Sequence, residues 1–461
     1  MASELFARCP RAKAMLVLTV AVLVLNIPTL RVVSQVSKID EREHIDHLVR
    51  GSHGEIGRHR ETLRQETLRE LCRRGSEIHA YPPCRPGELD PTDYAIGGGN
   101  VDPPGSLYYL PTGLTARFLR ALPVGSDSLV TWGRLLGSAW LLVGFYLVLR
   151  VGDRLGLDRS VLVVALVLAA AVPTQLHAAT TINPDVTSFV AGAGVLLAAL
   201  TWERGSRGIW VLGAVAAAAM LFDQSNGVGI LIVLLYLSYR GLGRYLGRAG
   251  GETRTTRQYG AAAVVLIAAT ILSVVGWDAL RDAVQDPLQA ADRGSEFETS
   301  EAERAALDPT RVYVDVDELR IETIANASEL FAMFPPVVDV APPERRLSTF
   351  EAVWYRVFER AVLLMMVGAI LVVVFRATLR SQVSALGLAT LTGLIVAPVL
   401  IHLYNWYEKG FFEPTVPRFG LSALPAIVLL VVAAVAQQKI ARFVLVVLTG
   451  GLYLTALTTL T

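Results

Sequence analysis

The sequence has 461 residues, of which 53% are hydrophobic and only 18% are charged, and its net charge is +1. Soluble domains carry about 25% charged residues, so this composition excludes an ordinary soluble protein and indicates an integral membrane protein. The near-zero net charge excludes a chain-wide basic surface for nucleic acid. Three cysteines exclude a disulfide-dense scaffold or a multi-cysteine metal site.

Apolar runs long enough to cross a bilayer recur along the chain. A helix needs roughly 20 apolar residues to span a hydrocarbon core about 30 Å thick. The expected fold class is therefore all-α, a polytopic transmembrane bundle. The sequence predicts about eleven spanning helices, near residues 14–33, 128–149, 161–178, 186–202, 209–222, 227–239, 261–277, 361–375, 383–403, 419–435 and 443–460. The two short runs on either side of Asp223 are also compatible with a re-entrant pair.

Arginines set the expected orientation, because short cytoplasmic loops hold an excess of Lys and Arg. Arg8, Arg11 and Lys13 precede the first run, which places the N-terminus in the cytoplasm. No small-residue cleavage site follows this run, so an uncleaved anchor is favoured over a signal peptide. Alternate threading then places the basic loops inside, near residues 150–159, 204–207, 240–257, 376–380 and 439–442.

The threading divides the chain into five parts and leaves two long loops outside the cytoplasm. The parts are the N-terminus with the first helix (1–36), a first outer loop with an acidic motif and juxtamembrane helices (37–127), helices two to seven (128–277), an acidic second outer loop (278–352) and the last four helices (353–461). An amphipathic stretch is expected near residues 319–334. Polar residues at a membrane edge are costly, so their concentration outside marks that side as the working face.

Four motifs lie on this outer side. The acidic pair Asp40-Glu41, followed by His44, comes directly after the first helix. The first outer loop closes on Asp102-Pro103-Pro104-Gly105-Ser106-Leu107-Tyr108-Tyr109. Thr181-Ile182-Asn183-Pro184-Asp185 lies between the third and fourth runs, and Pro417-Arg418-Phe419-Gly420 enters a late helix.

Together, these motifs resemble the GT-C superfamily of polytopic glycosyltransferases, and are especially similar to a bacterial branch with Asp-Glu-x-x-His near the N-terminus, Asn-Pro-Asp in mid-chain and Arg-Tyr-x-x-Pro late. The sequence departs from that pattern at Phe419 and at the inserted Gly105-Ser106. The resemblance implies an enzyme of the bacterial plasma membrane that transfers a sugar from a polyprenyl phosphate to an extracytoplasmic glycan, lipid or protein of the cell envelope.

Such a reaction needs a general base and a cation for the phosphate leaving group. Asp40 is the candidate base, because the first helix would present it at the membrane boundary, and Glu41 is the second catalytic candidate. The alternative is that both belong to a solvated helix end. Arg418 is the candidate for the donor phosphate, since a guanidinium fork suits that group, although interfacial arginines also snorkel to headgroups. Arg356 and Arg360, one turn apart, are the second choices.

The sugar or acceptor pocket is expected to contain His44, Asn183, Asp185, Tyr108 and Tyr109. The alternatives are an ordinary Asn-Pro-Asp helix cap and aromatic residues of the membrane interface. Asp223, Gln224 and Asn226 form a similar polar tip. Asp40, Glu41 and His44 could hold a divalent cation, magnesium or manganese, but the sequence does not establish a cofactor.

Two cysteines and one alternative function complete the expectations. Cys72 and Cys84 lie in the first outer loop, where an oxidising exterior permits a disulfide, whereas Cys9 should stay reduced. The alternative to an enzyme is a polytopic transporter or a flippase for lipid-linked sugars, and a silent scaffold is a third reading. The sequence has no phosphate-binding loop motif, which disfavours ATP-driven transport. It also has no clear internal repeat, which is common in secondary transporters.

Overall fold

The structure is a computed structural model that describes residues 10–32, 36, 41–57, 61–75, 81–94, 107–123, 126–247, 254–284, 349–376, 381–409 and 417–460. Within these ranges the regular elements are helices and no β-strand forms, which confirms the all-α class. Asp40 and the stretch near residues 319–334 lie outside the described residues.

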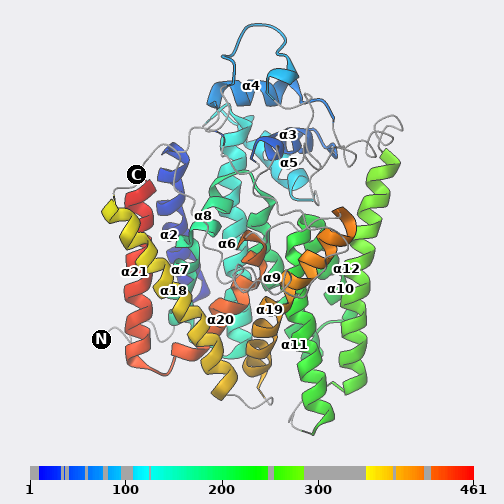
Figure 1. The fold of residues 1–461 in the computed structure, drawn as a ribbon, viewed down its shortest axis with the longest axis vertical. Coiled ribbons are helices and arrows are strands. Elements are labelled where there is room, and N and C mark those ends of the chain that lie inside the picture. Colours follow the sequence, from blue (N-terminus) through cyan, green and yellow to red (C-terminus); the bar gives the residue numbers. More distant parts are fainter. Residues whose placement is uncertain are drawn as a thin grey trace.

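The expected apolar runs coincide with helices that form an elongated bundle (Figure 1). These are α2 (Arg11–Val32), α6 (Leu129–Leu155), α7 (Arg159–Ala171), α8 (Pro173–Thr180), α9 (Thr187–Glu203), α10 (Ile209–Phe222), α11 (Gly227–Tyr245), α12 (Thr256–Val284), α18 (Thr349–Arg376), α19 (Gln382–Lys409), α20 (Leu424–Val435) and α21 (Lys439–Leu460). In the described part of the chain, eight helices are long and apolar enough to cross a membrane. The chain is therefore a membrane protein, and the full count of eleven spans stays a prediction.

The run expected as one span near residues 161–178 is broken. Its two halves, α7 and α8, are bent by 71° relative to each other. Pro173 occupies the start of α8, where its fixed φ and missing N–H begin a new helix and prevent continuation of the old one. The short α8 then leads into the Asn-Pro-Asp tip, so the bend positions a predicted site segment.

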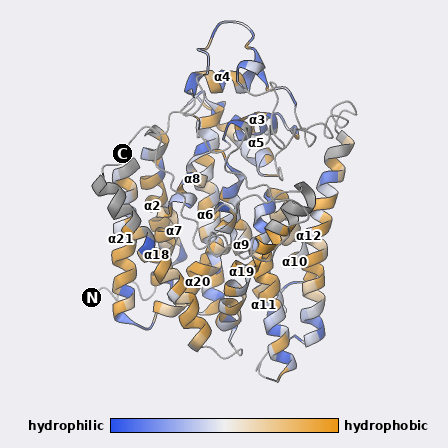
Figure 2. Cartoon of the chain, viewed as in Figure 1, coloured by the Kyte–Doolittle hydropathy of each residue, from blue (hydrophilic) through white to orange (hydrophobic). Residues whose placement is uncertain are grey.

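Three amphipathic helices cap one end of the bundle: α3 (Glu41–Ser52), α4 (Gln65–Arg74) and α5 (Tyr109–Arg120) (Figure 1). Figure 2 shows hydrophilic residues on these helices, whereas the bundle below them is mostly hydrophobic. α3 and α5 approach so closely that a Cβ at Gly113 would lie 2.5 Å from the backbone nitrogen of Ser52. Because Gly113 has no side chain, the backbones of α3 and α5 can contact each other at this crossing. The contact fixes α5, and with it Tyr108 and Tyr109, against α3.

Ionic contacts attach the cap to the bundle. Glu70 on α4 accepts hydrogen bonds from the Ser128 hydroxyl at 2.7 Å and from the Leu129 amide at 3.2 Å. These groups form the N-terminus of α6, whose positive dipole end favours a carboxylate. Within the cap, burial alone would raise the pKa of Asp46, but Arg50 at 2.7 Å holds that pKa below its ordinary value. The cap is thus a folded layer and not a loose loop.

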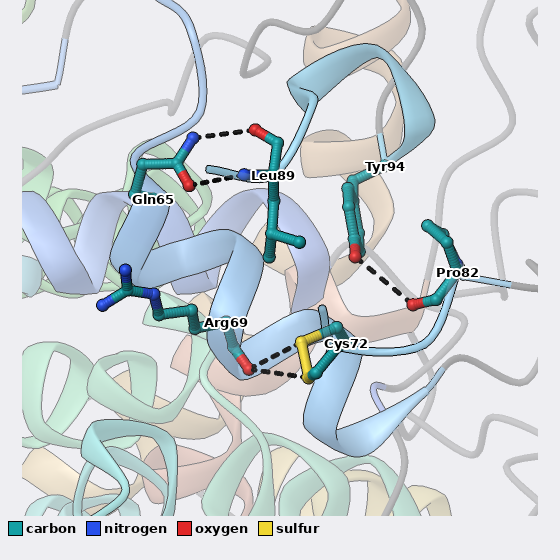
Figure 3. Close-up of a disulfide and its surroundings, with 7 residues drawn as sticks. Gln65, Arg69, Cys72, Pro82, Leu89 and Tyr94 are labelled. Atoms are coloured by element: carbon teal, nitrogen blue, oxygen red, sulfur yellow. Dashed lines mark hydrogen bonds between the residues drawn. A yellow bond between two sulfur atoms is a disulfide. The ribbon is translucent and has the colours of Figure 1, made fainter. Parts of the chain in front are cut away.

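A disulfide joins Cys72 to Cys84 at the outer edge of α4, with a Cα–Cα distance of 5.1 Å (Figure 3). Gln65 exchanges two hydrogen bonds with the Leu89 backbone at 2.8 and 2.9 Å. The Tyr94 hydroxyl donates to the Pro82 carbonyl. The Gln65 contacts attach the segment after Cys84 to α4, and the Tyr94 contact closes this segment on itself.

A buried polar cluster that the sequence did not predict lies at the other end of the bundle. Glu203 on α9 accepts hydrogen bonds from Arg240 at 3.0 Å, Tyr259 at 2.7 Å and Gln382 at 2.9 Å, and also from Tyr236. Its partners come from α11, α12 and α19. A buried carboxylate with several donors is satisfied, so this cluster holds four helices in register.

The 3-10 helix η6 (Pro417–Ala423) packs against α9 and α11, and its backbone contacts glycines of these helices directly. We expect Gly192→Ala to displace η6 and to destabilise the protein by about 1–3 kcal/mol, because a Cβ at Gly192 would lie 2.0 Å from the Ser422 carbonyl oxygen. Thermal unfolding in detergent measures the effect. Gly194→Ala on the same helix is the matched control, since a Cβ at Gly194 meets Val215 at an ordinary 3.6 Å. Equal midpoints for the two variants would contradict the prediction.

Candidate functional site

Glu41 joins two predicted motifs beneath the cap. It is the first residue of α3 and is fully buried. Its carboxylate oxygens accept hydrogen bonds from Nε and Nη2 of Arg134 at 2.8 and 2.7 Å. Oε1 also accepts the backbone N–H of Ile182 at 2.9 Å. The acidic motif is thereby fixed both to α6 and to the tip that carries Asn183 and Asp185.

The tyrosine pair from the end of the first outer loop lies beside the acidic motif. The Tyr109 hydroxyl is 2.6 Å from Nδ1 of His44, and both side chains are buried. Tyr108 packs edge-on against Tyr109, with ring centroids 5.1 Å apart. Burial and the nearby Glu41 carboxylate raise the pKa of Tyr108 above its ordinary value. The Tyr108 hydroxyl therefore keeps its proton at neutral pH.

Two short 3-10 turns, η3 (Pro184–Val186) and η4 (Gln224–Asn226), open α9 and α11 with side-chain caps. The Asn183 side chain accepts from the Asp185 amide at 2.8 Å, and the Asp223 side chain accepts from the Ser225 amide at 2.7 Å. Asn183 thus caps a turn, as the alternative interpretation of the sequence expected.

Arg418 brings the late motif to this tip. Its Nε atom lies 3.7 Å from Oδ2 of Asp185. Asp185 and Asp223 are each only 5% exposed, whereas the Arg418 side chain is 25% exposed. Arg418 is therefore the most exposed of these three charged side chains. A guanidinium held in place by a carboxylate is well suited to phosphate.

Asp223 lies at the tip between α10 and α11, outside the spanning helices. Burial, followed by the charge of Asp185, raises the pKa of Asp223 to about 7, although the Ser225 amide and Arg418 act in the opposite direction. A carboxyl group that titrates near neutral pH can take up or release a proton under working conditions. Asp223 is therefore a second candidate for proton transfer at this site.

This pKa predicts a pH dependence of stability. The folded state binds the Asp223 proton more tightly than the unfolded state, whose pKa is near the ordinary value of 3.8. The contribution of Asp223 is fully present below that ordinary value and is lost as pH rises through about 7. We expect Asp223→Asn to gain thermal stability relative to wild type as pH rises over this interval, whereas Asp93→Asn, at an exposed carboxylate, should track wild type. A constant difference between Asp223→Asn and wild type at all pH values would contradict the assignment.

The structure does not bring all predicted residues together. Asp40 lies outside the described residues, directly before Glu41 in sequence. Arg356 is on α18, and its side chain also lies outside the described part. Arg360 is exposed on the same helix and forms no hydrogen bond or ion pair with the described site residues. Arg418 is therefore the candidate for a donor phosphate that the geometry favours.

Glu41, which the sequence suggested as a general base or metal ligand, is engaged in a buried ion pair, so those two roles stay predictions. Both of its oxygens are held by Arg134, so it could take a proton or bind a cation only by breaking a buried ion pair. His44 is likewise engaged by Tyr109. Among the described residues, no group of three or more His, Cys, Asp or Glu side chains is placed to hold a metal. Glu41 is better described as a positioning residue, and we derive no step through a metal ion.

Sequence reasoning missed Arg134, which is the partner that buries Glu41. The signal was present, because Arg134 is a charged residue inside the apolar run 128–149. An ionisable residue within a spanning helix normally faces the bundle and has a partner. Its partner, however, lies 93 positions away along the chain, and only the fold shows it.

Two hydrogen bonds and one ion pair thus connect all four predicted motifs: Glu41 with the Ile182 amide, Tyr109 with His44, and Arg418 with Asp185. Comparison with known proteins gives no matching family model, no similar curated protein and no similar solved structure. A functional assignment therefore depends on the chemistry of this site.

Proposed function

We propose that the protein is a GT-C-type membrane glycosyltransferase, which moves a sugar from a polyprenyl phosphate to an extracytoplasmic acceptor of the bacterial cell envelope. The observation that carries the proposal is the convergence of the four motifs. They are separated by up to hundreds of residues in the sequence, yet hydrogen bonds and one ion pair connect them beneath the juxtamembrane cap. A set of unrelated helix caps would have no reason to converge in this way.

The proposed roles follow from the chemistry of sugar transfer. Asp40 takes the proton of the acceptor hydroxyl as that oxygen attacks the anomeric carbon, and the bond from this carbon to the phosphate oxygen breaks. Arg418 stabilises the negative charge that remains on the lipid phosphate. Glu41, fixed by Arg134, holds the start of α3 and so positions the preceding Asp40. Asp185 orients the Arg418 guanidinium.

The proposed orientation has the N-terminus in the cytoplasm and the cap outside. The charge distribution supports it, because the arginine-rich connections near residues 150–159 and 204–207 lie at the end of the bundle away from the cap. This orientation would let the site receive a donor lipid from the outer leaflet.

The proposal can be tested without knowledge of the sugar. Purified protein is incubated with a bacterial extract of polyprenyl-phosphate sugars and with cell-envelope glycans, and free polyprenyl phosphate is quantified. We expect release that depends on the acceptor. A transporter or flippase leaves the sugar-phosphate bond intact, so translocation of labelled donor across a proteoliposome without release would overturn the proposal in favour of that class.

A further inference from the structure

A hollow lined by arginines lies at the end of α6 that is distant from the cap. Its volume is about 330 Å³. α6 contains 27 residues, so its two ends lie about 40 Å apart, and its N-terminus is the end bound by Glu70. The hollow is therefore separate from the candidate functional site. The lining residues come from the start of α2, the end of α6 and the connection after α9: Arg11, Arg150, Asp153, Arg154, Arg204 and Ser206.

The charges in this hollow do not balance. Its single carboxylate, Asp153, is already paired with Arg11 at 2.6 Å and with Arg159 at 2.5 Å. Arg150, Arg154 and Arg204 have no carboxylate partner among the described residues. The Arg204 guanidinium donates to the Arg154 carbonyl, and Arg150 donates to the Tyr146 hydroxyl at 3.0 Å, so their recorded acceptors are neutral.

Three like charges around one cavity repel each other, and an anion in the cavity would relieve that repulsion. Arginine favours phosphate oxygens, because its planar fork can donate two parallel hydrogen bonds. A topological preference for cytoplasmic arginine explains the presence of these residues, but it does not require them to converge from three segments on one cavity.

The position of the hollow indicates where the phosphate comes from. Trp210, 77% exposed, lies in the first turn of α10 a few residues after Arg204, and Tyr146 on α6 is 40% exposed. Exposed aromatic residues of this kind mark the membrane interface, at the depth of the lipid headgroups. Basic pockets between spanning helices at this depth bind anionic headgroups.

We propose that this arginine pocket binds the phosphate of an anionic phospholipid headgroup in the membrane leaflet opposite the candidate active site. The negative charge of the lipid phosphate offsets the excess positive charge of the arginines between α2, α6 and the α9–α10 connection. It thereby stabilises the arrangement of these helix ends. The site does not depend on glycosyl transfer, so the two proposals can fail independently.

The test uses the full-length protein purified in detergent, with phosphatidylglycerol as the probe. We expect phosphatidylglycerol to raise the unfolding midpoint and to remain bound in native mass spectrometry. Phosphatidylcholine with the same acyl chains should do neither. Stabilisation by inorganic phosphate equal to that by phosphatidylglycerol would overturn the assignment to a lipid.

A matched pair of double variants tests the site itself. Arg150→Gln with Arg204→Gln should weaken binding of phosphatidylglycerol about tenfold or more, since it removes two of the three guanidinium groups that face the phosphate without a carboxylate partner among the described residues. Arg207→Gln with Arg257→Gln removes the same charge from exposed positions outside the pocket and should leave binding nearly unchanged. Equal losses in the two double variants would show a general surface-charge effect and would contradict the pocket. Native mass spectrometry counts bound lipid on the folded fraction, so a loss of stability does not obscure the result.

Discussion

Replacement of Asp40 by Asn should reduce turnover of lipid-linked sugar by about 10²–10⁴-fold, the usual contribution of a general base. The amide cannot accept the proton of the acceptor hydroxyl, but it has nearly the same size as the carboxylate. Donor binding should therefore change little, because the proposed phosphate contact is made by Arg418. The fold should also persist, because the substitution leaves the buried ion pair of Glu41 with Arg134 in place.

The expected loss is measured as kcat with a defined polyprenyl-phosphate sugar, together with donor affinity. Asp93→Asn is the matched control, since it removes an exposed carboxylate from the same outer region. Turnover by Asp40→Asn at the wild-type rate would contradict the assignment of the base. In that case Asp223, whose pKa is raised to about 7, would become the candidate, and Asp223→Asn would be measured in the same assay.

The second large effect is on stability. Arg134→Met should destabilise the protein by about 3–5 kcal/mol, because it leaves the Glu41 carboxylate buried without a counter-charge. Adding Glu41→Gln should restore much of that loss, since the neutral amide oxygen can still accept the Ile182 N–H. Arg134 is 1% exposed and Glu41 is fully buried, so solvent cannot replace either partner.

A double-mutant cycle of thermal or denaturant unfolding measures this coupling. The prediction is strong non-additivity, with the double variant more stable than Arg134→Met alone. Glu66 and Arg120 provide a comparison, because their ion pair connects α4 and α5 with both side chains 28% exposed and should contribute at most about 1 kcal/mol. Additive losses at Glu41 and Arg134 would show that the buried pair does not hold the acidic motif in place.

The helical class and the positions of the spanning runs were predictable, because a long apolar run has few other stable states in a bilayer. The polar tip at Asn183 and Asp185 was also visible, since a short polar segment between two apolar runs is costly unless it faces protein. The bend at Pro173 carried a signal too, but one proline in an apolar run does not reveal a change of direction of 71°.

Partners across the bundle were not predictable. In the hydropathy pattern, Arg134 is only one polar residue within an apolar run, and Glu203 lies beside a basic loop that is predicted to be cytoplasmic. Neither feature identifies a partner. In the structure both are buried in ionic clusters whose members come from different helices. The proximity of Asp223 to Asp185 likewise depends on the packing of both η3 and η4 against η6, which no local sequence pattern contains.

The proposed site for the donor phosphate, at Arg418, is tested most directly by locating that phosphate on the protein. A polyprenyl phosphate with a photoreactive group beside the phosphate is cross-linked to the purified protein, and the labelled peptides are identified by mass spectrometry. We expect labelling around residues 181–186 and 417–423, competed by unlabelled polyprenyl phosphate and reduced in Arg418→Gln. Labelling confined to the opposite end of the bundle, around residues 150–154 and 204–206, or unaffected by Arg418→Gln, would contradict the proposed site.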